Sequence, residues 1–266
     1  GQFSDNLYLE LKEKAISAAL KKLGHTVYEF DVLKADAKEL ITQANKSDFF
    51  LFHNGGIIAN EPLDLYMGIA GLSNLLKQIT STKIMWYFDR ILEQNNVFVE
   101  RILSLVDYAF LNDDTWVRRH KWENVYGLHM GTLKKPLGQF RKDLECDIAF
   151  VGRIYGGREE IITTLKKQYG KKFRVFGNIW GKDFNDLCQS AKIIFQPKWL
   201  NNDFCWGQQI YQVLGAGGFL VHPRLYGLKE EGSEEGTHYV GYTIYEELLA
   251  GLHFFLKPEN TDKRKL

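Results

Sequence analysis

The chain has 266 residues, a formal net charge of +1 at pH 7, 45% hydrophobic residues and 25% charged residues. This length suits two modest α/β domains, and the near-neutral charge excludes a global field that would hold nucleic acid or an anionic membrane. The three cysteines, Cys146, Cys188 and Cys205, lack metal-ligand spacing, which predicts thiols in a reducing compartment and no structural zinc. No apolar run is long enough to span a bilayer, so we expect a cytoplasmic protein.

Helical and strand-like segments alternate through the first half of the chain. Apolar residues at helical spacing predict a helix over 6–23, and Gly24 ends it. The alternation predicts a parallel sheet covered on both faces. An α/β domain normally opens with a strand, and none precedes the first helix here. The further predicted elements are strand 26–30, helix 35–44, strand 49–53, helix 62–78, strand 83–87, helix 95–106 and strand 108–111.

The alternation stops at 132–145 and then restarts. This polar stretch contains Pro136 and Gly138, which predicts a connection between a domain over 1–131 and a second over 146–266. We therefore expect an α/β protein with two Rossmann-like, doubly wound domains whose strands end at a common cleft. The elements predicted after the connection are strand 147–151, helix 158–169, strand 174–176, helix 184–191, strand 192–196, helix 207–215, strand 219–222 and helix 245–256.

A glycine-rich loop joins the first strand of the second domain to its helix. The loop runs from Gly152 to Gly157, with Arg153 inside it and Arg158 directly after it. Backbone N–H groups at such a turn, with two guanidinium groups, suit a diphosphate. A plain turn with solvated arginines explains the loop equally well. It is not a P-loop, because Arg158 and Glu159 stand where Lys and Ser/Thr are required, and no GxGxxG is present.

A second polar segment follows the strand predicted over 192–196. It begins Gln196-Pro197-Lys198 and continues into a helix from Gly207 that ends in a glycine cluster. Such a helix directs its amino end toward the carboxyl edge of the sheet, near Lys198.

From residue 147 to about residue 256, the chain resembles the C-terminal domain of GT-B glycosyltransferases, in particular the group-1-like family that includes the spore-maturation protein CgeB. The first half resembles this family more weakly. The segments that carry the resemblance are Asp147–Gly152, Phe176-Gly177, Ala191–Ile193, Ala216–Leu220, Tyr239–Tyr242, Glu246–Leu248 and, in the first half, Ala18–Leu20, Leu23–Val27 and Trp86–Asp89.

The resemblance implies a nucleotide-sugar donor site in the second domain. Gly152, Arg153 and Arg158 would lie at the diphosphate, and Gly177 and Trp180 near the nucleobase, although a Trp after a strand is as often a lid over the core. The ribose and pyrophosphate would lie at the helix that carries Gln208, Gln209 and Gln212. Relatives typically have Arg and Glu where this chain has Gln209 and Gln212, and a glutamine has lost the charge that strengthens such hydrogen bonds.

Candidate catalytic residues stand at predicted strand ends. His53 is the first candidate for a base that activates an acceptor hydroxyl, and Asp89 is the second. The alternatives are a turn-capping role for His53 and a helix N-cap role for Asp89. Lys198, with the two loop arginines, is a candidate for stabilising the leaving diphosphate. No Asp-x-Asp is present, so we expect neither a metal requirement nor a cofactor.

The function expected from the resemblance is transfer of a sugar from a nucleotide diphosphate to a hydroxyl acceptor: a glycan, a small molecule, a protein or a modified DNA base. A DNA acceptor would require a local basic surface, for which the segment from Arg118 to Trp122 is the compact candidate. The alternatives are a non-catalytic GT-B-like scaffold, favoured by Gln209 and Gln212, and a sugar-nucleotide epimerase.

Overall fold

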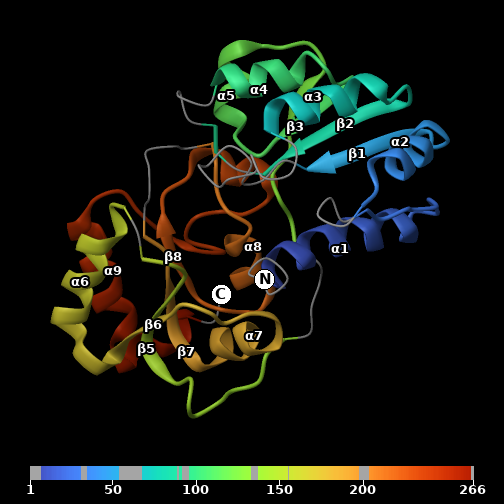
Figure 1. Ribbon diagram of the computed structural model, residues 1–266. Helices are drawn as coiled ribbons and strands as arrows, with labels where there is room; N and C mark the ends of the chain where they lie inside the picture. The colour runs from blue at the N-terminus through green and yellow to red at the C-terminus, as the bar shows by residue number, and fades with distance from the viewer. Residues whose placement is uncertain are drawn as a thin grey trace. The chain divides into compact units, whose positions relative to one another are not determined.

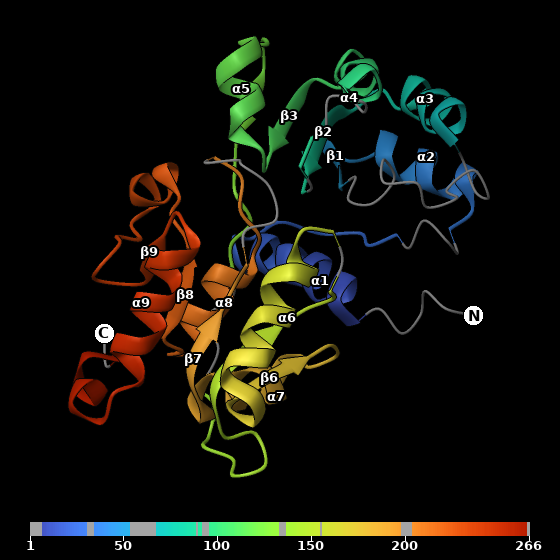
Figure 2. The same cartoon turned by 90° about the vertical axis from the view of Figure 1, so that its left-hand side faces the viewer.

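The computed structural model describes residues 7–30, 35–53, 68–88, 90–91, 96–132, 137–154, 156–197 and 204–264 (Figures 1 and 2). The chain divides into two compact units, Lys12–Met130 and a second formed by Gly1–Leu11 with Gly131–Leu266. Each unit contains one parallel β-sheet, of four and five strands respectively. The prediction of an α/β fold with two parallel sheets is confirmed.

The N-terminal unit has its four strands in sequence order, β1-β2-β3-β4. Every pair is parallel, so each connection crosses over in the same direction. Its elements are α1 (Leu7–Lys22) from Lys12 onward, α2 (Ala37–Asn45), β1 (Phe49–His53), α3 (Gly68–Gln78), β2 (Thr82–Tyr87), α4 (Asn96–Leu103), β3 (Tyr108–Leu111), α5 (Asp114–His120) and β4 (Val125–Gly127).

The core of this unit lies on one face of the sheet. Met85, Tyr87 and Leu111 point to that face and are at most 2% exposed. The alternate residues point to the other face, where Tyr108 is 42% and Tyr126 is 48% exposed. The alternation of side chains along the strands therefore separates a buried face of the sheet from a partly exposed face.

The strand predicted over 26–30 is wrong. These residues pair with none of the described strands, and a strand exists only through hydrogen bonds to a neighbour. The segment is held by side chains instead: Ser17 and Lys21 of α1 donate to the Glu29 carboxylate, and the His25 ring lies 6.0 Å from the Phe49 ring. The first part of the helix predicted over 62–78 lies outside the described residues, and α3 is described from Gly68.

The C-terminal unit has the strand order β6-β5-β7-β8-β9, all parallel. The helices predicted over 158–169 and 245–256 are confirmed residue for residue. Its elements are β5 (Cys146–Val151), α6 (Arg158–Tyr169), β6 (Phe173–Phe176), α7 (Gly181–Ser190), β7 (Ala191–Phe195), α8 (Gln209–Gly215), β8 (Leu220–Pro223), β9 (Val240–Tyr242) and α9 (Tyr245–Leu256), with 3₁₀ helices over Gly170–Lys172, Tyr226–Glu231 and Pro258–Arg264.

Both faces of this sheet are packed. Phe150 of β5 belongs to a buried cluster with Leu165 of α6 and Leu252 of α9. Ala149, the preceding residue, belongs to a second cluster with residues of α7 and α8, such as Val213. Figure 1 shows α6 and α9 on one side of the sheet and α7 and α8 on the other. The C-terminal unit is therefore doubly wound, as predicted.

The segment before β5 is bound to α7. The backbone N–H of Gln139 donates to Asp186 Oδ1 over 2.8 Å, and that of Arg141 donates to Ser190 Oγ over 2.8 Å. Gly138 approaches α7 so closely that an added Cβ would lie 2.0 Å from the backbone oxygen of Asn185. Residues 137–145, expected as part of a connection, are thus packed on the C-terminal unit.

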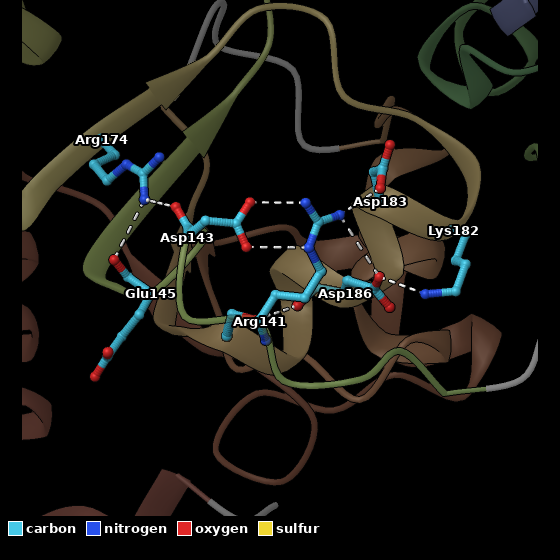
Figure 3. Close-up of polar contacts among 8 residues, drawn as sticks. Arg141, Asp143, Glu145, Arg174, Lys182, Asp183 and Asp186 are labelled. Carbon is cyan, nitrogen blue, oxygen red and sulfur yellow. Dashed lines mark hydrogen bonds and ion pairs between the residues drawn. The ribbon is translucent and has the colours of Figure 1, made fainter.

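A charged network reinforces this attachment (Figure 3). The Arg141 guanidinium donates to both carboxylate oxygens of Asp143, over 3.2 and 2.7 Å, and to Asp183 over 2.6 Å. Lys182 Nζ lies 2.6 Å from the buried Asp186 carboxylate, and this hydrogen bond, with the one from Gln139, holds the pKa of Asp186 below its usual value. The bidentate contact with Asp143 fixes the orientation of the Arg141 guanidinium in addition to pairing its charge.

Candidate functional site

The strand order of the C-terminal unit creates a switch point at the carboxyl ends of β5 and β7. From β5 the chain passes to β6 on one side of β5, and from β6 it returns to β7 on the other side. The connections that follow β5 and β7 therefore leave the sheet in opposite directions, which opens a crevice where ligands bind in open α/β sheets. The predicted donor residues of the Gly152 loop and of α8 belong to these two connections.

The loop after β5 contains two glycines with positive φ. Gly152 has φ +141° and Gly156 has φ +60°, conformations that favour glycine. Arg158 Nη1 donates to the backbone oxygen of Arg153 over 3.4 Å, and Arg153 is exposed. The first turn of α6 contains two glutamates, which favours the helix but opposes an anion. The arginines must therefore supply the positive charge.

The glutamines of α8 are tied to the loops around them. Gln209 Nε2 donates to the backbone oxygen of Val151 over 3.1 Å, which joins the start of α8 to the end of β5. Gln208 Nε2 donates to the backbone oxygen of Gly131 over 2.9 Å. Gln212 is half-buried one turn further along α8. The fold brings these three residues and Gly152 to the same edge of the sheet.

A pocket of about 400 Å³ lies beside the end of β6. The Gly152 N–H donates over 3.0 Å to the backbone oxygen of Phe176, which is one of the residues that line this pocket. The Arg174 guanidinium lies 4.7 Å from the centre of the Phe176 ring. Gly177 belongs to the lining, whereas Trp180, at the start of α7, does not. The lining consists of Arg141, Leu144, Val175, Phe176, Gly177, Asn178, Ile179 and Asp183.

Of the two candidate bases, the structure describes one. His53 ends β1, and its ring stacks on the Phe88 ring at 4.9 Å with 17° between the planes. Asp89 lies outside the described residues, and so does Lys198 of the predicted donor site. The catalytic assignments of His53 and Asp89 stay predictions.

The basic segment at the end of α5 lies beside a stack of three aromatic rings, those of Trp116, His120 and Trp122. The His120 ring lies 4.7 Å from the Trp116 ring and 4.6 Å from the Trp122 ring, with less than 10° between the planes. Arg119 lies 5.5 Å from the centre of the Trp116 ring, and Arg118 pairs with Asp114. The basic side chains here pack on, or pair with, their own helix as well as facing solvent.

Two residues at strand ends were not predicted as site residues. Gln196 directly follows β7 and is 7% exposed. His222 is the third residue of β8, its Nδ1 lies 2.7 Å from the accepting Pro223 carbonyl oxygen, and burial lowers its pKa to about 4. Gln196 is the first polar residue after an apolar strand, and His222 is the polar residue that interrupts one, so the sequence offered a signal for both.

In the described part of the chain, no group of three or more His, Cys, Asp or Glu side chains is placed to hold a metal ion. Of the described helices, none has the length and apolar character needed to cross a membrane.

Part of the C-terminal unit matches a known protein family. Residues 156–265 match a family model described as glycosyl transferase-like. Among curated proteins, none matches the sequence.

Solved structures resemble most of the chain at low sequence identity. Anabaena HepE in complex with UDP-glucose is 11% identical, with a TM-score of 0.61 over 94% of this chain and 81% of HepE. An α-glucosyltransferase in complex with UDP-glucose and DNA containing an abasic site is 8% identical, with a TM-score of 0.58 over 86% of this chain and 76% of that one. TarM is 10% identical, with a TM-score of 0.56 over 86% of this chain and 51% of TarM. The chain therefore has the GT-B fold, and its residues 156–265 are similar to the glycosyl transferase-like family.

Proposed function

We propose that this chain is a nucleotide-sugar-dependent glycosyltransferase that moves a sugar from a nucleoside diphosphate to a hydroxyl acceptor. The observation that carries the proposal is the position of the Gly152 loop. It combines two glycines of positive φ with Arg153 and Arg158, and it lies at the switch point of the unit whose residues 156–265 match the glycosyl transferase-like family. Sugar transfer releases a diphosphate, and cations aimed at that leaving group stabilise the transition state.

In this proposal the donor lies along the carboxyl edge of the C-terminal sheet. Backbone N–H groups near Gly152, with Arg153 and Arg158, bind the diphosphate, and Lys198 adds a further positive charge. The nucleobase occupies the pocket beside β6, where Gly177 leaves room for a flat ring. The glutamines of α8 bind the ribose through neutral hydrogen bonds, since a glutamine both donates and accepts.

His53 or Asp89 removes the proton from the acceptor hydroxyl in an inverting reaction. A base at this step needs hydrogen-bond reach of the hydroxyl and a protonation state matched to the working pH. In a retaining reaction neither residue is needed as a base, and charge stabilisation of the diphosphate does more of the work.

The finer assignments are also part of the proposal. Membership of the group-1-like family that includes CgeB is supported by the motifs of the second half. A cytoplasmic location is supported by the three cysteines, none of which forms a disulfide. The proposal leaves the acceptor open among a glycan, a small molecule, a protein and a modified DNA base, and it requires neither a metal nor a cofactor.

The test is a thermal-shift and calorimetry panel of uridine, guanosine, adenosine and thymidine diphosphates and their glucose conjugates. A ligand at a hundred times its Kd stabilises the native state by about 2.7 kcal/mol, so binding is visible as a higher melting temperature. We expect one base to bind and Arg153→Ala to weaken it about tenfold, because a charge-assisted hydrogen bond is lost. The matched control is Lys167→Ala, an exposed cation at the other end of α6.

Binding to none of these compounds at millimolar concentration would contradict the proposal. Binding that never leads to sugar transfer or donor hydrolysis would instead support the non-catalytic scaffold.

A further inference from the structure

Two buried amide groups at the edge of the C-terminal sheet have unused hydrogen-bonding atoms. Gln196 is 7% exposed and Gln208 is 8% exposed. Among the described residues, no partner is found for the donor Gln196 Nε2 or for the acceptor Gln208 Oε1. Buried polar atoms are nearly always paired, and leaving one unpaired costs stability. Each exception therefore needs a cause.

The backbone around Gln196 is fixed, so its amide has little freedom to find a partner. Its N–H donates to the Val221 oxygen over 2.9 Å, and its carbonyl oxygen accepts from the buried Tyr242 hydroxyl over 2.9 Å. Along β7, Ile194 belongs to the core on the α7 and α8 side, and strand alternation places Gln196 on that same side. Its neighbour strand β5 ends where Gln209 binds the Val151 oxygen.

Gln208 lies on the same side of the sheet, at the start of α8, and its orientation is fixed by its partner. The Gly131 group that it contacts is a carbonyl oxygen, which only the NH₂ end of the amide can satisfy. The acceptor Oε1 is therefore left at the other end. The same edge of the sheet thus presents one buried donor and one buried acceptor.

We propose that Gln196 and Gln208 bind a hydroxyl-bearing ring of the nucleotide sugar. A hydroxyl group accepts from Gln196 Nε2 and donates to Gln208 Oε1, so it satisfies both amides, directly or through a neighbouring hydroxyl. Phosphate oxygens only accept and ammonium groups only donate, so neither complements the pair. The inference rests on the proposed function, and the ring is either the ribose or the transferred sugar.

This role separates Gln196 from a glutamine that merely holds the fold. Gln189 is a matched case in the same unit: its Nε2 donates to the Ala216 oxygen over 2.6 Å. Replacing Gln189 by Met breaks a made bond and lowers the melting temperature, whereas Gln196→Met removes an amide whose NH₂ is unpaired. For Gln196→Met we expect a higher melting temperature in the absence of ligand, because the substitution removes a buried NH₂ group that has no partner there. We also expect weaker ligand binding, because the ligand is the group that satisfies this NH₂.

The experiment uses the whole chain and the nucleotide that binds most tightly in the panel above. Melting temperatures without ligand and Kd values for the nucleoside diphosphate, its glucose conjugate and inorganic pyrophosphate are measured for wild type, Gln196→Met, Gln196→Glu and Gln189→Met. We expect both Gln196 variants to lose about tenfold in nucleotide affinity, with pyrophosphate affinity unchanged. Gln189→Met should keep all three affinities.

The two sources of the ring are distinguished by the ligands. Loss of affinity for the diphosphate and the conjugate alike assigns the ribose, and loss for the conjugate alone assigns the transferred sugar. Unchanged affinity for both the diphosphate and the conjugate in both Gln196 variants, with a wild type that binds, would overturn this inference and leave the proposed function intact. A wild type that binds no nucleotide would overturn both.

Discussion

The two sheets are built from similar strands but differ in strand order and in packing. The N-terminal sheet runs β1-β2-β3-β4 and has its buried cluster on one face, whereas the C-terminal sheet runs β6-β5-β7-β8-β9 and has a cluster on each face. Among the described strands, a reversal of order occurs only in the C-terminal sheet. A ligand crevice in such sheets arises from that reversal, so the strand order, rather than the strand composition, indicates where the proposed donor site lies.

The largest expected effect tests the difference in packing. Phe150 of β5 is fully buried between neighbouring strands and α6, and Phe150→Ala should cost about 4 kcal/mol, from lost burial and the cavity left behind. The matched change is Phe110→Ala on the half-covered face of the N-terminal sheet, for which we expect about 1 kcal/mol. Urea unfolding followed by circular dichroism measures both. Equal costs would show that the second face of the N-terminal sheet is as well packed as the first.

The next test asks whether residues 137–145 belong to the core of the C-terminal unit. Gly138→Ala places a Cβ against the Asn185 backbone, which cannot move without distorting α7, so we expect a loss of about 2 kcal/mol. The control is Gly131→Ala, where an added Cβ meets nothing within 4 Å. Thermal unfolding of the two variants checks the expectation. Similar stability in both would mean that the segment is only loosely attached.

A third test uses pH at the carboxyl edge of the C-terminal sheet. Burial lowers the pKa of His222 from 6.5 to about 4, so between these values the unfolded chain binds more protons than the native one. The free energy of unfolding therefore falls as pH falls through this window, by on the order of 2 kcal/mol from this residue. Denaturation at pH 7 and pH 4.5 measures it. The difference should shrink in His222→Asn, and an unchanged difference would exclude His222 as its source.

The smallest effect concerns thiol reactivity in the C-terminal core. Burial raises the pKa of Cys146 to about 11 and that of Cys188 to about 12, so both are protonated at pH 8. Because the thiolate is the reactive form, a thiol reagent should label them only after unfolding. Mass spectrometry before and after denaturant checks this. Labelling of Cys188 in the native state would reveal opening of the core between α7 and β8.

Local patterns predicted the elements well, and non-local pairing explains the failures. The strand over 49–53 and the helix over 158–169 carry their periodicity in their own residues, and both bounds are confirmed. The segment over 26–30 has the same strand-like composition, but whether it pairs depends on residues elsewhere in the chain. The composition of a segment does not determine whether another strand lies beside it to form hydrogen bonds.

The candidate site shows the same division. The Gly152 loop was predictable because glycine and arginine act there within seven residues. The burial of Gln196 depends on the register of β7 against β5 and on the Tyr242 hydroxyl 46 residues away, which no local pattern contains. The hydrogen bond from Gln209 to the Val151 oxygen likewise joins two elements, and it gives Gln209 a structural contact in addition to its predicted role at the donor.

The ring stack at the end of α5 places two indole rings of the N-terminal unit in contact with one imidazole. His120 touches the rings of both Trp116 and Trp122, whereas the indole N–H of Trp206 in the C-terminal unit donates to Tyr211. Unfolding of the N-terminal unit separates the stacked rings, so the fluorescence of Trp116 and Trp122 should report on that unit.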